Sequence, residues 1–107
     1  MKFLTLAFTV AIAGSHVSLA GAAGDAAQGR DKASNCMGCH GVTSYFNTYP
    51  TYRVPRLGGQ HTEYLVSALQ AYRAGDREHS TMQAQAASLS DQDMADLAAY
   101  FASFGRP

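Results

Sequence analysis

The most constraining feature of the chain is one pentapeptide, Cys36-Met37-Gly38-Cys39-His40. It has the C-x-x-C-H pattern at which c-type haem is attached. Two thiols at this spacing can each add to one haem vinyl group, and the adjoining imidazole can then ligate the iron. The pattern therefore predicts one covalently bound haem c, held through Cys36 and Cys39, with His40 as an axial ligand.

A C-x-x-C pair also occurs in thioredoxin-like dithiols, in zinc sites and in disulfides. A four-ligand zinc site would need two more ligands, and only His61 and His79 remain in the expected mature chain, too far apart for a finger pattern. A thioredoxin-like site requires strands around the cysteines, and no strand-rich stretch surrounds them. We therefore favour haem attachment over these alternatives.

The amino terminus resembles a secretory signal peptide. Lys2 supplies a positive charge, residues 3–14 are an apolar run too short to span a bilayer, and small residues at 18 and 20 suit cleavage near 20–23. We expect residues 1–20 to be removed on export to the periplasm, which excludes His16 as a ligand; a retained anchor is the alternative. Residues 24–107 then form one domain without an integral membrane span.

Composition limits what this domain can do. After residue 23 the chain holds seven basic and eight acidic residues, a formal charge of −1. It has no basic patch with interleaved aromatics, so nucleic acid binding is not indicated. A mature chain of about 85 residues has a marginal side-chain core, and a buried porphyrin would supply much of the missing apolar area.

Three helices are expected. Asp25 can cap a first helix over 26–35, and residues 60–74 place Leu65, Ala68, Leu69 and Tyr72 on one apolar face that ends at Gly75. Ser90 and Asp93 form a variant capping box that opens a third helix to about residue 104, with Met94 on its apolar face. Residues 41–59 and the polar stretch 76–89 show no regular element.

The aromatic residues of 41–59 suit a segment that wraps a cofactor, and we place Tyr45 and Phe46 near the haem crevice. For the sixth iron position, Met37 lies inside the attachment motif and Met94 is better explained by core packing. Met82 lies between two helices with enough slack to reach the haem, so we expect it to be the second axial ligand.

Two histidines remain to be placed. His79 lies in the same stretch as Met82 and is its rival as an iron ligand, because imidazole binds iron well. His61 opens the second helix and is expected to face solvent.

Beyond the pentapeptide, matching residues run in order along nearly the whole mature chain. On these residues the chain resembles class I c-type cytochromes, and more narrowly the small bacterial cytochromes c553 and the single halves of dihaem cytochrome c4. The matching stretches are Cys36, Cys39, His40 and Gly41, then residues 54–61, Tyr64-Leu65, residues 72–75, Arg77, Met82, residues 89–93 and Ala99-Tyr100.

The resemblance implies an all-α class I cytochrome c fold, with three main helices around one covalently attached haem. It implies that Pro55 accepts a hydrogen bond from His40 Nδ1, that Leu57 packs on the porphyrin and that Met82 is the distal ligand. It also implies that the first and last helices cross at Gly29, opposite residues 100 and 101. The chain departs from the family by having Lys32 and Ala33 where a large aromatic would complete that crossing.

The expected function is periplasmic transfer of single electrons, with no bond made or broken in a substrate and hence no enzymatic activity. Its partners would be redox proteins, a donor and an acceptor such as a cytochrome complex and a terminal oxidase or reductase. The alternative is a haem sensor or catalytic subunit with an open or labile sixth iron site. That alternative requires that Met82 does not ligate.

Overall fold

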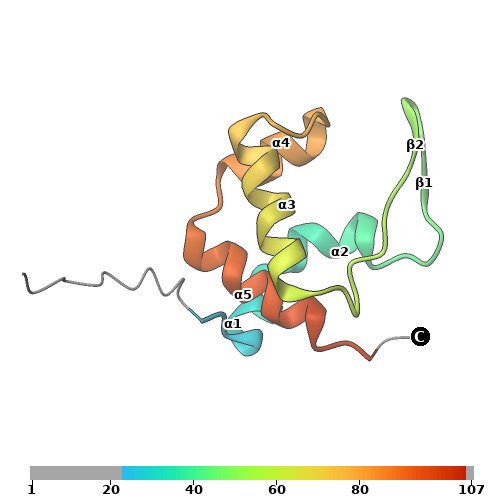
Figure 1. The fold of residues 1–107 in the computed structure, drawn as a ribbon. Helices are drawn as coiled ribbons and strands as arrows, with labels where there is room; N and C mark the ends of the chain where they lie inside the picture. The colour runs from blue at the N-terminus through green and yellow to red at the C-terminus, as the bar shows by residue number, and fades with distance from the viewer. Residues whose placement is uncertain (1–22, 106–107) are drawn as a thin grey trace, which may run out of the picture.

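A computed structural model describes residues 23–105, and the expected signal peptide lies outside the described residues. Figure 1 shows helices gathered on one side and a narrow hairpin that projects away from them. The elements in order are α1 (Ala26–Lys32), α2 (Ser34–His40), β1 (Phe46–Thr48), β2 (Thr51–Arg53), α3 (Thr62–Ala74), α4 (Ser80–Ala87) and α5 (Asp91–Ala102).

The first helical stretch is longer than expected and is divided in two. The Asp25 side chain caps α1, accepting hydrogen bonds from the backbone N–H groups of residues 27 and 28. The chain turns at Ala33, and α2 then continues through the whole pentapeptide to a C-cap at Gly41. Residues 34–40 contain neither proline nor a β-branched residue, and the helix continues through Gly38 to its end at Gly41.

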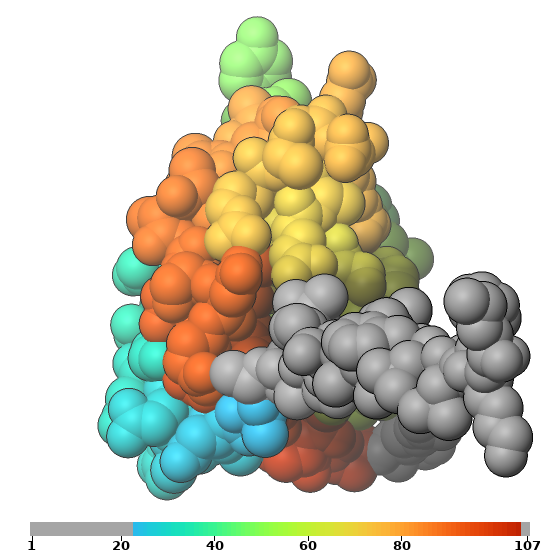
Figure 2. All heavy atoms as spheres, turned by 60° about the vertical axis from the view of Figure 1, so that its left-hand side comes forward, coloured from blue at the N-terminus to red at the C-terminus, as the bar shows by residue number. Residues whose placement is uncertain are grey.

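Helices α1 and α5 cross at close range, and Figure 2 shows the blue α1 directly against the orange of α5. A side chain at Gly29 would overlap the carbonyl of Asp96 and would lie 2.8 Å from Tyr100 Cβ. The crossing implied by the resemblance is thus present, and it is tight without an aromatic from α1. Lys32 lies at this interface and bridges Asp93 and Asp96 of α5 at 2.8 and 2.6 Å.

The expectation of no regular structure in residues 41–59 is wrong. Strands β1 and β2 form an antiparallel hairpin in which Phe46 pairs with Arg53 and Asn47 with Tyr52, with a cis peptide bond before Pro50 at its tip. Alternation puts Asn47 and Tyr52 on the partly buried face and their strand neighbours on the exposed face.

Helix α3 confirms the expected second helix. Gly75 ends it in the left-handed conformation, at φ 82°, and its N–H returns to the carbonyls of residues 71 and 72. The expected third helix is also confirmed as α5, where Ser90 and Asp93 form both hydrogen bonds of a capping box.

The expected loop over residues 76–89 is wrong in its second half, which folds as α4. Helix α4 packs on α3, and Arg73 spans the segment between α3 and α5 by bonding Leu89 O and Asp91 Oδ1. The buried core is small, and its contact cluster consists of Ala33, Leu65, Leu97, Ala98 and Phe101. Met94 is also fully buried, as its expected core role requires.

Candidate haem-binding site

A cavity of about 530 Å³ lies between the helices and the hairpin. It brings together residues from α2, from the segment after β2, and from α4. All six residues expected from the sequence line it: Cys36, Cys39, His40, Pro55, Leu57 and Met82. The two candidate iron ligands are 42 positions apart in the sequence and reach the cavity from different helices.

The orientation of His40 is fixed by Pro55, whose carbonyl oxygen lies 2.7 Å from His40 Nδ1. A carbonyl oxygen can only accept a hydrogen bond, so Nδ1 carries the proton and is the donor. In a neutral imidazole the other nitrogen then has a free lone pair. His40 Nε2 is therefore in the form that ligates a metal, with the other ring nitrogen hydrogen-bonded as in most protein metal sites.

The two cysteines are one helical turn apart on α2, so both sulfurs reach the same cavity. Cys36 is half-buried and packs against the core, whereas Cys39 is exposed. Burial raises the pKa of the Cys36 thiol. In the haem-attached protein the sulfur atoms of both cysteines would be thioethers.

The methionines are separated by the fold as the sequence suggests. Met82 lines the cavity from α4, Met37 is 38% exposed, and Met94 is fully buried in the core. His61 precedes α3, is exposed and does not line the cavity, whereas His79 lines it and caps α4.

The apolar stripe of α3 is a wall of this cavity, although its spacing predicted only core. Leu65, Ala68, Leu69 and Tyr72 all line it, and Leu65 also belongs to the buried core. The core and the cofactor site are thus one unit, in which a large part of the apolar surface of α3 and α5 faces the cavity.

The expected placement of Tyr45 and Phe46 is wrong, because neither lines the cavity. Phe46 is 55% exposed and packs against the guanidinium of Arg53, 5.6 Å from its ring centre. The hairpin instead turns Tyr52 toward the cavity, because Tyr52 occupies the inward-facing strand position. The order Thr51-Tyr52-Arg53 fits this placement, but in β1 the polar Asn47 faces inward and the aromatic Phe46 outward, so alternation alone would not have indicated it.

The charged residues around the cavity carry an excess of positive charge. Lys32 is neutralised by its two carboxylate partners. Three arginines remain, Arg53, Arg56 and Arg77, against the single carboxylate of Glu78. Among residues 23–105 none of these arginines forms an ion pair, although Arg77 lies over the Tyr72 ring.

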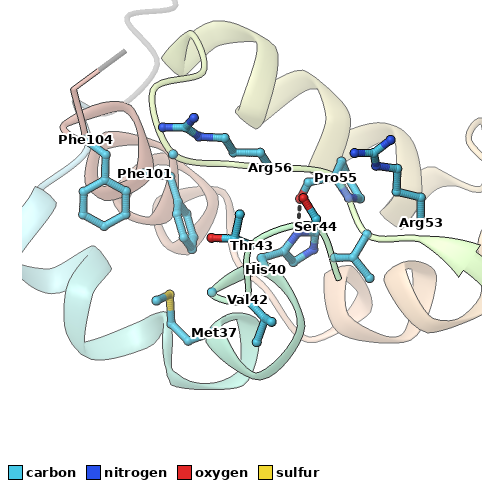
Figure 3. A pocket seen from close by; sticks show the side chains of 13 residues that line it. Met37, His40, Val42, Thr43, Ser44, Arg53, Pro55, Arg56, Phe101 and Phe104 are labelled. Carbon is cyan, nitrogen blue, oxygen red and sulfur yellow. Dashed lines mark hydrogen bonds between the residues drawn. The ribbon is translucent and has the colours of Figure 1, made fainter. Parts of the chain in front are cut away.

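A second hollow, of about 590 Å³, shares the His40 and Pro55 wall with the main cavity. Figure 3 shows Met37 below it, Phe101 and Phe104 to one side, and Arg56 above. Its lining contains neither cysteine nor Met82, so among residues 23–105 the donor atoms for a haem converge on the first cavity.

The main cavity fits a covalently attached haem. Two adjacent sulfurs, an imidazole with a free Nε2 and a thioether meet across a largely apolar space. This set of donors is the one found in His/Met-ligated c-type cytochromes. Within the described part of the chain, no helix has the length and apolar character needed to cross a membrane.

Comparison with known proteins agrees with this geometry. The family described as "Cytochrome c" matches residues 26–104. Cytochrome c-554(548) of Halomonas halodenitrificans is 46% identical over 84 residues, which cover 76% of this chain and 98% of that protein. Cytochrome c4 of Pseudomonas aeruginosa is 45% identical over 85 residues, covering 79% of this chain and 41% of that protein.

The fold is also similar to that of a known cytochrome. The crystal structure of reduced recombinant cytochrome c4 from Pseudomonas stutzeri superposes with a TM-score of 0.63 at 37% identity, over 78% of this chain and 47% of that one. The chain thus spans less than half the length of these two cytochromes c4, but nearly all of cytochrome c-554(548). It belongs to the cytochrome c family, as a class I c-type cytochrome that transfers electrons through covalently bound haem c.

Proposed function

We propose that the protein is a periplasmic carrier of single electrons whose haem iron is ligated by His40 and Met82. The observation that carries this proposal is the shared lining of one cavity by both cysteines, His40 and Met82. Met94 is buried in the core and His61 does not line the cavity, so the rival ligand in the cavity is His79, whose Nδ1 accepts a hydrogen bond from the Met82 N–H.

Each residue has a distinct part in this proposal. Bound haem c supplies the one-electron couple of its iron. Cys36 and Cys39 anchor the group, and Pro55 holds the His40 ring through the Nδ1 hydrogen bond, which raises the basicity of Nε2. The neutral Met82 thioether favours ferrous iron and so raises the reduction potential.

Residues around the ligands keep water out. Leu57 is half-buried, packs against the core and would lie on the porphyrin. No residue in this arrangement is needed to activate a substrate, so we propose an electron carrier and not an enzyme. Fixed ligands on two helices mean that little has to move when an electron enters or leaves.

The proposal includes export. Residues 1–20 would be a signal peptide cleaved near 20–23, and residues 24–107 would be the mature monohaem domain. Its partners would be an electron donor and an electron acceptor, such as a cytochrome complex and a terminal oxidase or reductase.

The decisive experiment is visible spectroscopy of the exported holoprotein, oxidised and reduced, with and without carbon monoxide. We expect a low-spin spectrum, a weak red methionine-to-iron band in the ferric form, and no reaction of the ferrous form with carbon monoxide. Met82→Ala should abolish the band and open the iron to carbon monoxide. Met37→Ala is the matched control, because Met37 is an exposed methionine that lines the second hollow and not the main cavity.

A high-spin spectrum or ready binding of carbon monoxide by the wild-type protein would contradict the proposal. Met82 would then not be a ligand, and the alternative of a haem sensor or catalytic subunit would take its place. Periplasmic export is tested separately, by the amino-terminal sequence of the mature protein.

A further inference from the structure

His79 is the N-cap residue of α4, the helix that bears Met82. Its Nδ1 atom accepts a hydrogen bond from the backbone N–H of Met82 at 3.4 Å. The side chains usually found at N-caps are Ser, Thr, Asp and Asn, which accept the same bond through an oxygen. A histidine here satisfies one of the unpaired N–H groups of the helix and also presents an aromatic ring.

That ring is held from the other side by the hairpin. The rings of Tyr52 and His79 meet edge to face, with centroids 4.6 Å apart and an interplanar angle of 88°. Tyr52 occupies the inward-facing position of β2, and both residues line the main cavity. The contact links two segments 27 positions apart in the sequence and joins the hairpin to the start of α4.

The hydrogen bond also decides which ring nitrogen carries the proton. A backbone N–H can only donate, so His79 Nδ1 supplies the lone pair and the proton of the neutral ring is on Nε2. Ligation of iron by either nitrogen of this ring would therefore require the loss of the hydrogen bond to the Met82 N–H. His40 has the opposite arrangement, with the proton on Nδ1 and the lone pair on Nε2. The two cavity histidines are thus distinguished by their hydrogen-bond partners.

Met82 depends on this cap more than a residue of a long helix would. Helix α4 has eight residues, and helices this short are unstable in isolation. Met82 is the third residue of the helix, so its own N–H is the group that the cap satisfies. A change at His79 therefore acts directly on the backbone of the residue that we propose as the ligand.

We propose that His79 is a positioning residue, which with Tyr52 holds the Met82 backbone where its thioether can ligate the iron, and is not itself an iron ligand. The inference rests on the proposed ligation by Met82. It also implies that ligation by Met82 depends on the hairpin, because the ring of Tyr52 packs against the His79 ring that caps α4.

The test compares His79→Ala with His79→Asn in the holoprotein. Alanine removes the cap, whereas asparagine restores an acceptor that can bond the same N–H. The readouts are the red methionine-to-iron band and the rate at which exogenous imidazole replaces the sixth ligand in the ferric protein. Loss of one cap should raise that rate roughly fivefold. His79→Asn should recover most of the difference.

Tyr52 gives a second, independent pair of variants. Tyr52→Phe keeps the ring contact with His79 and should behave as wild type, whereas Tyr52→Ala removes the ring and should increase the rate of imidazole binding. Ser90→Ala is the matched control, because it removes the N-cap of α5 and does not touch the cavity. It should lower overall stability without changing the band or the rate.

Each result has a defined meaning. A normal band and rate in His79→Ala would overturn the positioning role. Complete loss of the low-spin spectrum in His79→Ala, with Met82→Ala unchanged from wild type, would show that His79 is the ligand and would overturn both proposals. If the wild-type protein itself lacks the band, ligation by Met82 fails and the proposal for His79 fails with it.

Discussion

Gly29 of α1 lies so close to Asp96 of α5 that a methyl group on the glycine would overlap the Asp96 carbonyl oxygen. The contact is between backbones, which cannot move aside as the end of a flexible side chain can. The close approach also brings Lys32 to Asp96, whose side chain is almost completely buried. The absence of a side chain at position 29 therefore allows both the crossing and the ion pair beneath it.

Gly29→Ala should lower stability, although replacing glycine by alanine within a helix ordinarily stabilises it by about 1 kcal/mol. Forcing a methyl group into a packed interface costs about 1 to 3 kcal/mol, so we expect a net loss. The measurement is denaturant unfolding of the ferric holoprotein. Gln28→Ala puts the same residue on the exposed face and should change stability by less than about 0.5 kcal/mol. Equal or greater stability of Gly29→Ala would contradict the tight crossing.

The lowered pKa of the Asp96 carboxyl predicts that the protein loses stability in acid. The Asp25 N–H, and then Lys32 and Gln92, lower the pKa of this carboxyl from 3.8 to about 2. Below pH 3.8 the unfolded chain therefore binds a proton that the folded chain does not, so stability should fall between pH 3.8 and about 2. Asp96→Asn should be less stable at neutral pH and should show a shallower fall in acid.

Part of the acid dependence should survive in that variant. Asp93 also has its pKa lowered to about 2, first by Lys32 and then by Ser90. The measurement is the urea midpoint at a series of pH values, with Asp31→Asn as the control because Asp31 is an exposed carboxylate on the same helix as Lys32. An unchanged slope in Asp96→Asn would refute the assignment.

The positive charges of the cavity arginines should raise the reduction potential of the haem, so their removal should lower it. Arg53 and Arg56 line the main cavity, and neither is paired with a carboxylate among residues 23–105. Reduction adds a negative charge at the site, which nearby positive charges stabilise. Replacing either arginine by glutamine should therefore lower the midpoint potential by on the order of tens of millivolts.

Arg30→Gln is the control for this experiment. Arg30 is an exposed arginine of α1 that does not line the cavity, so its loss changes the net charge by the same amount. Equilibrium redox titration at low and moderate salt measures the difference between the variants. A shift of the same size in Arg30→Gln would mean that net charge, and not the position of these arginines, sets the effect.

Local signals predicted a large part of this fold. The caps at Asp25 and Ser90 and the helix end at Gly75 each depend on a few adjacent residues, and all three were identified correctly. The hairpin and α4 were missed because their support is not local. Helix α4 begins at a histidine cap that is backed by a tyrosine from the hairpin, and this contact exists only in the folded chain.

In the site, too, some residues could be predicted from local sequence and others could not. Cys36, Cys39 and His40 follow from one short pattern, and Met82 follows from ligand chemistry and its place between two helices. Pro55 and Leu57 came from the family resemblance alone, and the structure puts all six around one cavity. The inward position of Tyr52 depended on the register of strands that were not predicted. The use of α3 as a cavity wall could not be read from its spacing, because core and cofactor pocket require the same apolar stripe.

This shared use of the core predicts that the haem is required for folding. Four of the five residues of the core's contact cluster, Leu65, Leu97, Ala98 and Phe101, also line the cavity of about 530 Å³. Without the cofactor these apolar side chains would face water, and each Å² of apolar surface left unburied forgoes about 25 cal/mol of stabilisation. A typical domain has a total stability of only about 5 to 15 kcal/mol, so the loss of this burial should unfold it.

The double variant Cys36→Ala/Cys39→Ala, which cannot form either thioether, should therefore lack a cooperative thermal transition. It should also lose the near-ultraviolet circular dichroism that reports packed aromatic side chains. Met82→Ala is the matched control, because it keeps both cysteines and so separates the loss of the cofactor from the loss of a ligand. A double variant that contains no haem but unfolds cooperatively at the wild-type midpoint would show that α1, α3 and α5 pack without it.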